Sequence, residues 1–95
     1  MIKEDVAPLP ELPFNHAFYI NLQFNQRSEE VRWLQKGLIR LGYKTYATGF
    51  YGDITRMAVL KFQQDNKVDN SLILWALQGK YVGPKTRSAL NKLLN

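Results

Sequence analysis

The chain has 95 residues and a mass of 11.0 kDa, which is enough for one small domain and too little for a two-domain enzyme. Hydrophobic residues make up 45% and charged residues 22%, so the chain can bury a core, which excludes a wholly disordered or collagen-like polypeptide. The lack of cysteine excludes disulfide frameworks and thiolate metal sites, and the single histidine, His16, excludes most other transition-metal and triad chemistry.

The formal charge of +5 is unevenly distributed. Residues 28–95 hold 11 basic and 5 acidic side chains, a net charge of +6, whereas residues 1–27 carry a net charge of −1. The part expected to fold is therefore the basic part. Such an excess favours polyanionic partners such as nucleic acid, anionic lipid or an anionic cell wall, and it is equally consistent with simple solubility.

Prolines dominate the first segment. Pro8, Pro10 and Pro13 favour extended backbone, so we interpret residues 1–17 as a proline-rich leader or linker and residues 18–95 as the domain. The N-terminus lacks the apolar stretch of a signal peptide, and no run approaches the roughly 18 apolar residues of a membrane span. Work outside the cytoplasm would then require export by a larger parent chain or phage-type release.

The next segment is rich in aromatic and β-favouring residues. Alternation of Phe18, Ile20, Leu22 and Phe24 predicts an extended segment laid across the core. Because one short strand cannot form a sheet, we expect this segment to dock on the helices without pairing.

From Ser28 onward the hydrophobic period becomes helical. Ser28 is a good N-cap, and apolar residues then recur at helical spacing until Gly42, which predicts a first helix. A second helix is predicted from Asp53 to about Asn66. Its expected buried face consists of Ile54, Met57, Ala58 and Phe62.

Pro84 is of the kind that opens a helix, and it predicts a third helix. The residues of that helix expected to point inward are Ala89, Leu90, Leu93 and Leu94. Residues 71–78, between the second and third helices, form an apolar stretch with Asn70 or Ser71 as a cap. Either this stretch packs back as a short fourth helix, which we prefer, or its Trp75 forms a docking surface for a partner domain, a second copy or a ligand.

A repeat lies within the chain. A glycine turn that holds an aromatic residue precedes a helix twice, over 49–59 and again over 79–90. In each copy a threonine, Thr55 or Thr86, stands three residues after the second glycine, and an alanine stands three residues further on. We place Tyr51 and Tyr81 at equivalent positions of the two copies.

These residues resemble the peptidoglycan-binding domain of bacterial and phage cell-wall hydrolases. The resemblance covers residues 28–94 and rests on four ordered sub-motifs. They are Val31-Arg32-Trp33-Leu34-Gln35, Leu41-Gly42-Tyr43, Gly49 through Phe62-Gln63, and Gly83 through Leu90. The sequence departs from the family pattern between Gln63 and Gly83, where the usual short loop is longer.

The resemblance implies an all-α fold, a compact three-helix bundle with an extended lead-in. It also implies a non-catalytic module, without cofactor or metal, that attaches a protein such as a cell-wall hydrolase to murein. Its place would be the cell wall or periplasm, its partners glycan strands, stem peptides and a catalytic domain, with no membrane. If residues 71–78 form a docking surface instead of packing back, a catalytic domain or other partner would bind through the Trp75 region.

The glycine turns and the helix starts that follow them supply the expected ligand-binding residues. Sugar rings stack on exposed aromatic rings, and arginine binds carboxylates. The candidates are Tyr43, Tyr46, Phe50, Tyr51, Arg56, Tyr81 and Arg87. Tyr51 and Tyr81 fit the core beneath their turns better than ligand contact, whereas two arginines in first helical turns are unfavourable for the helix dipole and hint at use.

Catalysis by this chain is not expected. A glycosidase needs two facing carboxyl groups, and Glu29, Glu30 and Asp53 are each explained by a helix start. The alternative to wall binding is a small basic three-helix domain that binds nucleic acid. Its recognition helix would carry Arg56, Lys61, Gln63, Gln64, Asn66 and Lys67.

Overall fold

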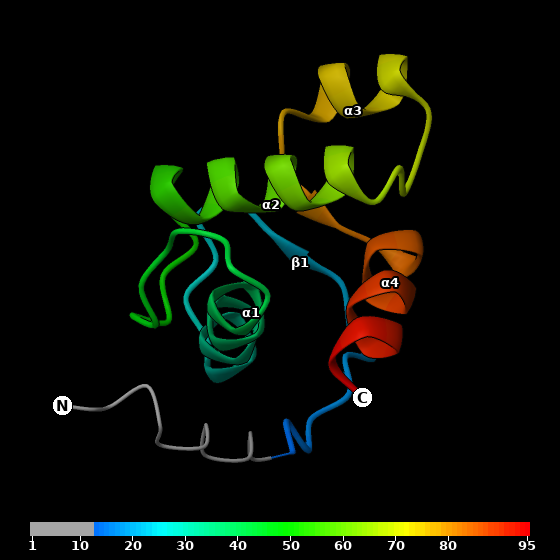
Figure 1. The fold of residues 1–95 in the computed structure, drawn as a ribbon. Helices are drawn as coiled ribbons and strands as arrows, with labels where there is room; N and C mark the ends of the chain where they lie inside the picture. The colour runs from blue at the N-terminus through cyan, green and yellow to red at the C-terminus, as the bar shows by residue number, and fades with distance from the viewer. Residues whose placement is uncertain (1–12) are drawn as a thin grey trace, which may run out of the picture.

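The computed structural model describes residues 13–95, so most of the expected leader lies outside the described residues. In chain order the elements are β1 (Leu22–Gln23), α1 (Glu29–Arg40), α2 (Asp53–Asp65), α3 (Ser71–Leu77), β2 (Tyr81–Val82) and α4 (Pro84–Leu94). Figure 1 shows α2 between α3 on one side and α1 and α4 on the other. The predicted all-α class is confirmed, with a fourth helix added to the expected three.

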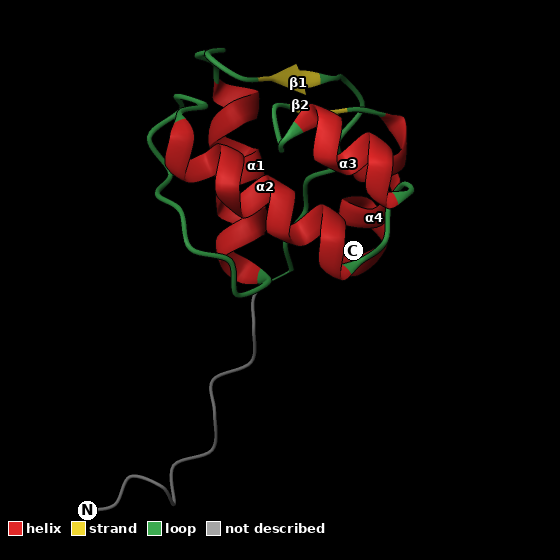
Figure 2. Ribbon diagram, turned by 90° about the horizontal axis from the view of Figure 1, so that it is seen from above, coloured by secondary structure: helices red, strands yellow, loops and turns green. Residues whose placement is uncertain are grey.

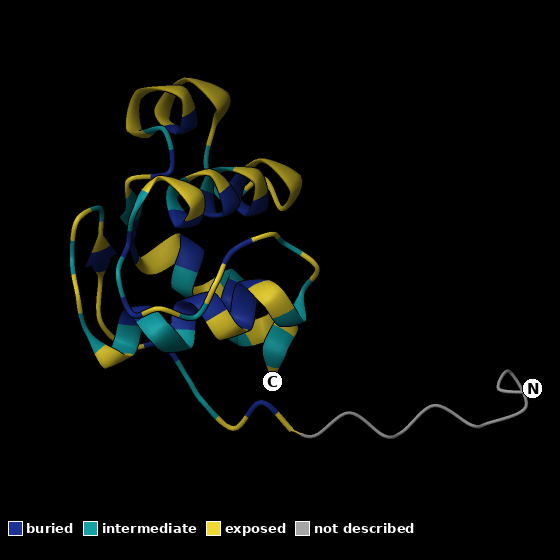
Figure 3. Ribbon diagram, turned by 90° about the vertical axis from the view of Figure 1, so that its left-hand side faces the viewer, coloured by how far each residue is buried: buried dark blue, intermediate teal, exposed yellow. Residues whose placement is uncertain are grey.

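The helix starts follow from their capping residues. Ser28 Oγ accepts a hydrogen bond from Val31 N (3.2 Å), and the two glutamates that follow place negative charge in the first turn of α1. Asn70 Oδ1 accepts from Ile73 N (2.9 Å) at the start of α3. The preferred interpretation of residues 71–78 as a short helix is confirmed, although Leu74 is the only buried residue of α3. Figure 3 shows most of this helix as exposed.

The core lies between α1, α2, α4 and the N-terminal segment. Its buried hydrophobic residues are Phe14, Phe18, Leu22, Val31, Leu34, Leu38, Tyr51, Ala58, Val59, Phe62, Val82 and Leu90. On α2 the expected buried face is wrong for Ile54 and Met57, which are 53% and 61% exposed. Thr55, Val59 and Gln63 are buried in their place, because the core-facing side of α2 is rotated by about one residue, or 100°, from the expected one. Leu93 of α4 is likewise exposed.

The N-terminal segment begins to pack earlier than expected. Phe14 is buried in the core and packs in a T-shaped arrangement with the Trp33 ring, and His16 stacks on the same ring with the ring centres 4.3 Å apart. The fold therefore starts before residue 18. Ile20, expected on the core, is exposed because the chain bends there between the buried Phe18 and Leu22.

Strand β1 forms a sheet, so the expectation that the segment would dock without pairing is wrong. Leu22 pairs with Val82 and Gln23 with Tyr81 in an antiparallel register, beside the helices in Figure 2. The following residues then bond the other glycine turn, since Tyr51 N donates to Gln26 O (2.9 Å). One extended segment thus joins two turns that lie about 30 residues apart in the sequence.

The first glycine turn, residues 45–52, is held by the side-chain amide of Gln35. Gln35 Nε2 donates to Phe50 O (2.8 Å) and to Thr55 Oγ1 (2.9 Å), and Gln35 Oε1 accepts from Gly49 N (2.8 Å). The amide is fully buried. We call this set of bonds the first glutamine clamp.

The second glycine turn, residues 79–83, has a matching second clamp. Gln63 Nε2 donates to Tyr81 O (2.9 Å) and to Thr86 Oγ1 (3.1 Å). Tyr81 is therefore the counterpart of Phe50, and the buried Val82 is the counterpart of Tyr51. The expected equivalence of Tyr51 and Tyr81 is wrong by one position, because the two turns align on the N-cap glycines Gly52 and Gly83.

The two clamps predict unequal effects of the same substitution. Gln35→Leu leaves buried groups on Gly49, Phe50 and Thr55 with one partner fewer, so we expect a loss of about 3 kcal/mol in the free energy of unfolding. Gln63→Leu removes two bonds and should cost about 1–2 kcal/mol. Urea denaturation followed by circular dichroism measures both, with the exposed Gln64→Leu as control; an equal loss at positions 35 and 63 would contradict the comparison.

Candidate functional site

The turn after α1 and the exposed side of α2 enclose the larger of two adjacent depressions. This groove has a volume of about 780 Å³, and its wall includes Tyr43, Tyr46, Ile54, Met57 and Lys61. Tyr46 is 56% exposed, so its ring is available to a ligand. Ile54 and Met57, which we expected in the core, form part of the apolar wall of this groove.

A second depression of about 310 Å³ adjoins the groove and shares Tyr46 and Ile54 with it. Its wall includes Phe50, whose ring lies against Gly52 and has the Arg27 guanidinium 4.6 Å from its centre. A side chain at Gly52 would crowd this ring, since a Cβ there would lie 3.0 Å from it. We use the name aromatic surface for the joined walls of the two depressions. It comprises Tyr43, Tyr46, Phe50, Ile54, Met57 and Lys61.

The first clamp positions this surface. Gln35 fixes the backbone of Gly49 and Phe50 from below, and Thr45 Oγ1 lies 2.8 Å from Thr55 Oγ1, which ties the start of the turn to α2. The turn that carries Tyr46 therefore has a fixed shape without regular secondary structure. A preorganised surface loses less entropy when a ligand binds.

Tyr43 is the rigid side of the groove. Its ring packs in a T-shaped arrangement with the Phe62 ring, with the ring centres 5.6 Å apart, and its hydroxyl donates to Asp65 Oδ2 (2.9 Å). Burial raises the pKa of Tyr43, and the Asp65 carboxylate raises it further. The hydrogen bond from Tyr43 holds the pKa of Asp65 below its usual value, and Lys61 lowers it further.

Tyr51 lies outside the aromatic surface, because it is fully buried. Its hydroxyl donates to Gly79 O (2.6 Å), which joins the two glycine turns, and burial raises its pKa. The alternative that Tyr51 fills the core beneath its turn agrees with this position, and we remove it from the ligand-binding candidates.

The remaining candidates also lie elsewhere. Arg56 donates from Nη1 to Gln78 O (2.9 Å) and from Nε to Asp53 Oδ1 (3.1 Å). Arg87 donates from Nε to Asn21 Oδ1 (3.1 Å). Both arginines hold neighbouring segments, which accounts for cations in first helical turns. Tyr81 lines a different cavity, between α3 and α4.

The aromatic surface is suited to binding, since it offers aromatic and apolar wall with an ammonium group beside it. Exposed tyrosine rings pack against the apolar faces of sugars, and the Lys61 ammonium can pair with a carboxylate. Within residues 13–95, no group of three or more His, Cys, Asp or Glu side chains is placed to hold a metal ion. No helix among these residues has the length and apolar character that crossing a bilayer requires.

A signal for Ile54 and Met57 was present in the sequence. The repeat places Thr55 and Thr86 at matched positions, and a threonine facing the clamp fixes which side of α2 is buried. Ile54 precedes Thr55 by one residue, or 100° around the helix, and so lies off the buried side. We nevertheless expected Ile54 and Met57 on the buried side because both are apolar.

The carboxylate of Asp65 gives a test of the groove's geometry. Tyr43→Phe removes the hydrogen bond that lowers the pKa of Asp65 most, so this pKa should rise towards the ordinary value. Lys61→Met should raise the pKa of Asp65 less. Because the folded-state pKa is lowered, the contact stabilises the fold above the ordinary carboxyl pKa and is lost as the pH falls through the folded value. Carboxyl carbon NMR titration measures both variants; a larger effect of Lys61→Met would refute this order.

Comparison with known proteins gives a family match. Residues 27–69 match the sequence model of a family described as "Putative peptidoglycan binding domain". This stretch contains α1, α2, the first glutamine clamp and every residue of the aromatic surface. No curated protein and no solved structure matches the chain significantly. Residues 27–69 are therefore similar to a peptidoglycan-binding domain.

Proposed function

We propose that the chain is a non-catalytic module that binds peptidoglycan through its aromatic surface and so attaches a protein to the bacterial cell wall. The observation that carries the proposal is the exposed Tyr46 beside an apolar groove, inside the residues that match the family. A binding module needs a fixed surface and no reacting group, which agrees with the clamped turn.

The groove's chemistry supports a glycan ligand. A sugar ring packs its apolar face on Tyr46 and on the wall formed by Ile54 and Met57. The lactyl carboxylate of muramic acid is paired by Lys61. The groove's volume of about 780 Å³ falls within the range of about 300–1,000 Å³ that is usual for small-ligand sites.

The neighbour of such a module is a catalytic domain, and a cell-wall hydrolase is the neighbour that fits best. The site of action is then the cell wall or periplasm, reached with a larger parent chain or by phage-type release. The net charge of +6 on residues 28–95 supports this placement, because the wall's carboxylates and phosphates are anionic.

Binding of nucleic acid by α2 has less support. Of the six residues expected to read bases, Gln63 is buried in the second clamp, and Arg56 is engaged by Gln78 and Asp53. Asn66 Nδ2 donates to Phe62 O (2.9 Å) at the end of the helix. Lys61, Gln64 and Lys67 remain exposed, which is a small set for reading a duplex.

Cosedimentation with purified peptidoglycan sacculi tests the proposal. The wild-type protein should pellet with sacculi at low salt, and Tyr46→Ala should weaken binding about tenfold, the effect of losing about 1.4 kcal/mol. The melting temperature should stay the same, because the Tyr46 side chain is mostly exposed.

Trp75→Ala is the matched control, since it removes an exposed aromatic ring that lies outside the aromatic surface. It should leave sedimentation unchanged. Loss of binding in Trp75→Ala with none in Tyr46→Ala would move the site to α3. No pelleting of the wild-type protein, together with tight binding to duplex DNA, would favour the nucleic-acid alternative.

A further inference from the structure

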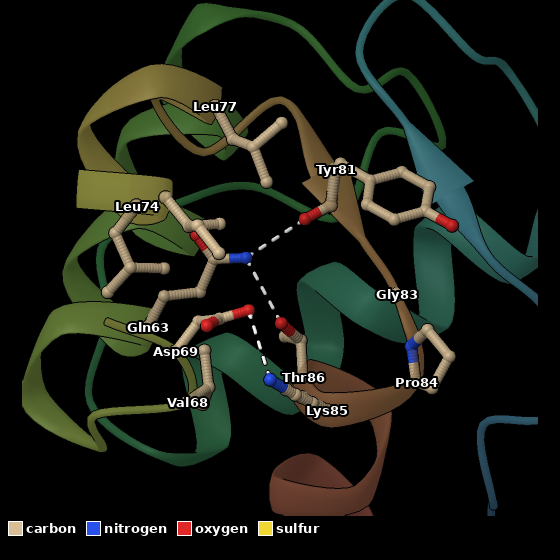
Figure 4. Close-up of a pocket in the computed structure, with 11 residues that line it drawn as sticks. Gln63, Val68, Asp69, Leu74, Leu77, Tyr81, Gly83, Pro84, Lys85 and Thr86 are labelled. Carbon is tan, nitrogen blue, oxygen red and sulfur yellow. Dashed lines mark hydrogen bonds and ion pairs between the residues drawn. The ribbon is translucent and has the colours of Figure 1, made fainter. Parts of the chain in front are cut away.

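A separate cavity lies between α3 and the start of α4. Its volume is about 260 Å³, and it shares no residue with the aromatic surface. Figure 4 shows Leu74 and Leu77 of α3 on one side, the strand and turn from Tyr81 to Thr86 on the other, and Gln63 between them.

Gln63 carries a polar atom without a protein partner. Its Oε1 is buried and makes no hydrogen bond with any described residue, whereas Gln35 Oε1 in the first clamp accepts from Gly49 N. Counting back from the N-cap glycines, the counterpart of Gly49 is Lys80. Lys80 N donates instead to Leu77 O (2.9 Å) at the end of α3. Because Lys80 N donates to the end of α3, it is not available to Gln63 Oε1.

The orientation of the Gln63 amide is settled by its neighbours. Tyr81 O accepts only, so the group facing it must be the NH₂. The acceptor oxygen then lies on the opposite side of the amide, the side of Leu74 in Figure 4. A buried acceptor left unpaired costs about 1–3 kcal/mol, so an N–H donor brought to this point binds favourably.

The remaining wall restricts what can bring that donor. Val68, Ile73, Leu74 and Leu77 make most of the wall apolar. The charged groups that line it are Asp69 and Lys85, which form an ion pair of 3.4 Å. Lys85 is largely exposed, so its ammonium can also meet a carboxylate arriving from solvent.

The volume of the cavity limits the size of the ligand. A volume of about 260 Å³ lies just below the range of about 300–1,000 Å³ that is usual for drug-sized ligands. It suits one or two small residues of a peptide. A compact apolar side chain such as a methyl, a backbone N–H and a terminal carboxylate together match the wall, the orphaned oxygen and Lys85.

Entry of a ligand requires a movement of α3. The oxygen is sealed in the structure, so a ligand must displace the side chains of α3 that cover it. Leu74 is the one buried residue of this seven-residue helix. A short outward shift of α3 therefore exposes little core.

We propose that this cavity binds the end of an alanyl peptide, whose backbone N–H donates to Gln63 Oε1 and whose carboxylate meets Lys85. The identification of that peptide with the stem peptide of peptidoglycan rests on the proposed function. The module then has two sites, one on each glycine turn, for the two chemical components of one polymer.

Titration with N-acetyl-D-alanyl-D-alanine, followed by NMR of the wild-type protein, tests the cavity without sacculi. Saturable shifts are expected at the Gln63 side-chain amide and at the methyl groups of Leu74 and Leu77. The ester analogue N-acetyl-D-alanyl-D-lactate replaces the donating N–H by oxygen, so it should bind at least tenfold more weakly. Equal binding of the ester, or shifts confined to the aromatic surface, would overturn the proposal.

Two substitutions test the location of the site. Gln63→Leu should weaken dipeptide binding about tenfold, and Ile73→Trp should block the cavity even if Gln63→Leu does not fold. Leu72→Trp is the matched control, because Leu72 is its exposed neighbour outside the cavity wall. Unchanged binding in Ile73→Trp, or no saturable binding at all because water alone occupies the cavity, would refute the site.

The outcome is independent of wall attachment. Dipeptide binding by a protein that does not sediment with sacculi would leave the cavity site standing and contradict the proposed function. Sedimentation with sacculi without dipeptide binding would support the proposed function and contradict the cavity site.

Discussion

The buried amide of Gln35 is the interaction on which the rest of the structure depends. The turn that follows α1 has no ladder of backbone bonds of its own, and its polar groups would be costly to bury without partners. One side chain supplies donors to Phe50 and Thr55 and an acceptor for Gly49. It thereby sets the shape of the turn, the start of α2 and the position of the rings at the surface. A single amide that joins two helices and a turn also explains how so small a chain keeps an irregular segment ordered.

The same arrangement occurs twice, in two turns with different surroundings. The backbone at the two N-cap glycines is nearly identical, with φ and ψ of −99° and −164° at Gly52 and of −103° and −165° at Gly83. The first turn is open and bordered by aromatic rings. The second is covered by α3, which redirects one backbone donor and leaves the amide oxygen of Gln63 unpaired. The same frame therefore presents an exposed surface in one copy and an enclosed cavity in the other.

Local signals predicted the helices well, because capping side chains such as Ser28 and Asn70 act within three residues of themselves. The pairing of β1 with β2 was beyond such reasoning, since strands of two residues carry no periodicity and depend on partners far along the chain. The buried side of α2 was predictable from Thr55 but was assigned from the apolar residues Ile54 and Met57. The contact of Arg56 with Gln78 O could not be foreseen, because the path of α3 brings Gln78 to it. Among the expected site residues, Tyr43, Tyr46 and Phe50 come together in space and the others do not.

The contacts of Asn91 affect how the chain folds during synthesis. Its side chain accepts from Phe18 N (2.7 Å) and donates to Phe18 O (3.0 Å), and Asn95 donates to His16 O (2.9 Å). Leu90 beside it is fully buried in the core. The N-terminal segment therefore gains these contacts only after α4 has left the ribosome. Because domains generally fold as units, we expect the nascent chain to stay unfolded until translation has passed α4, and then to fold in one cooperative step.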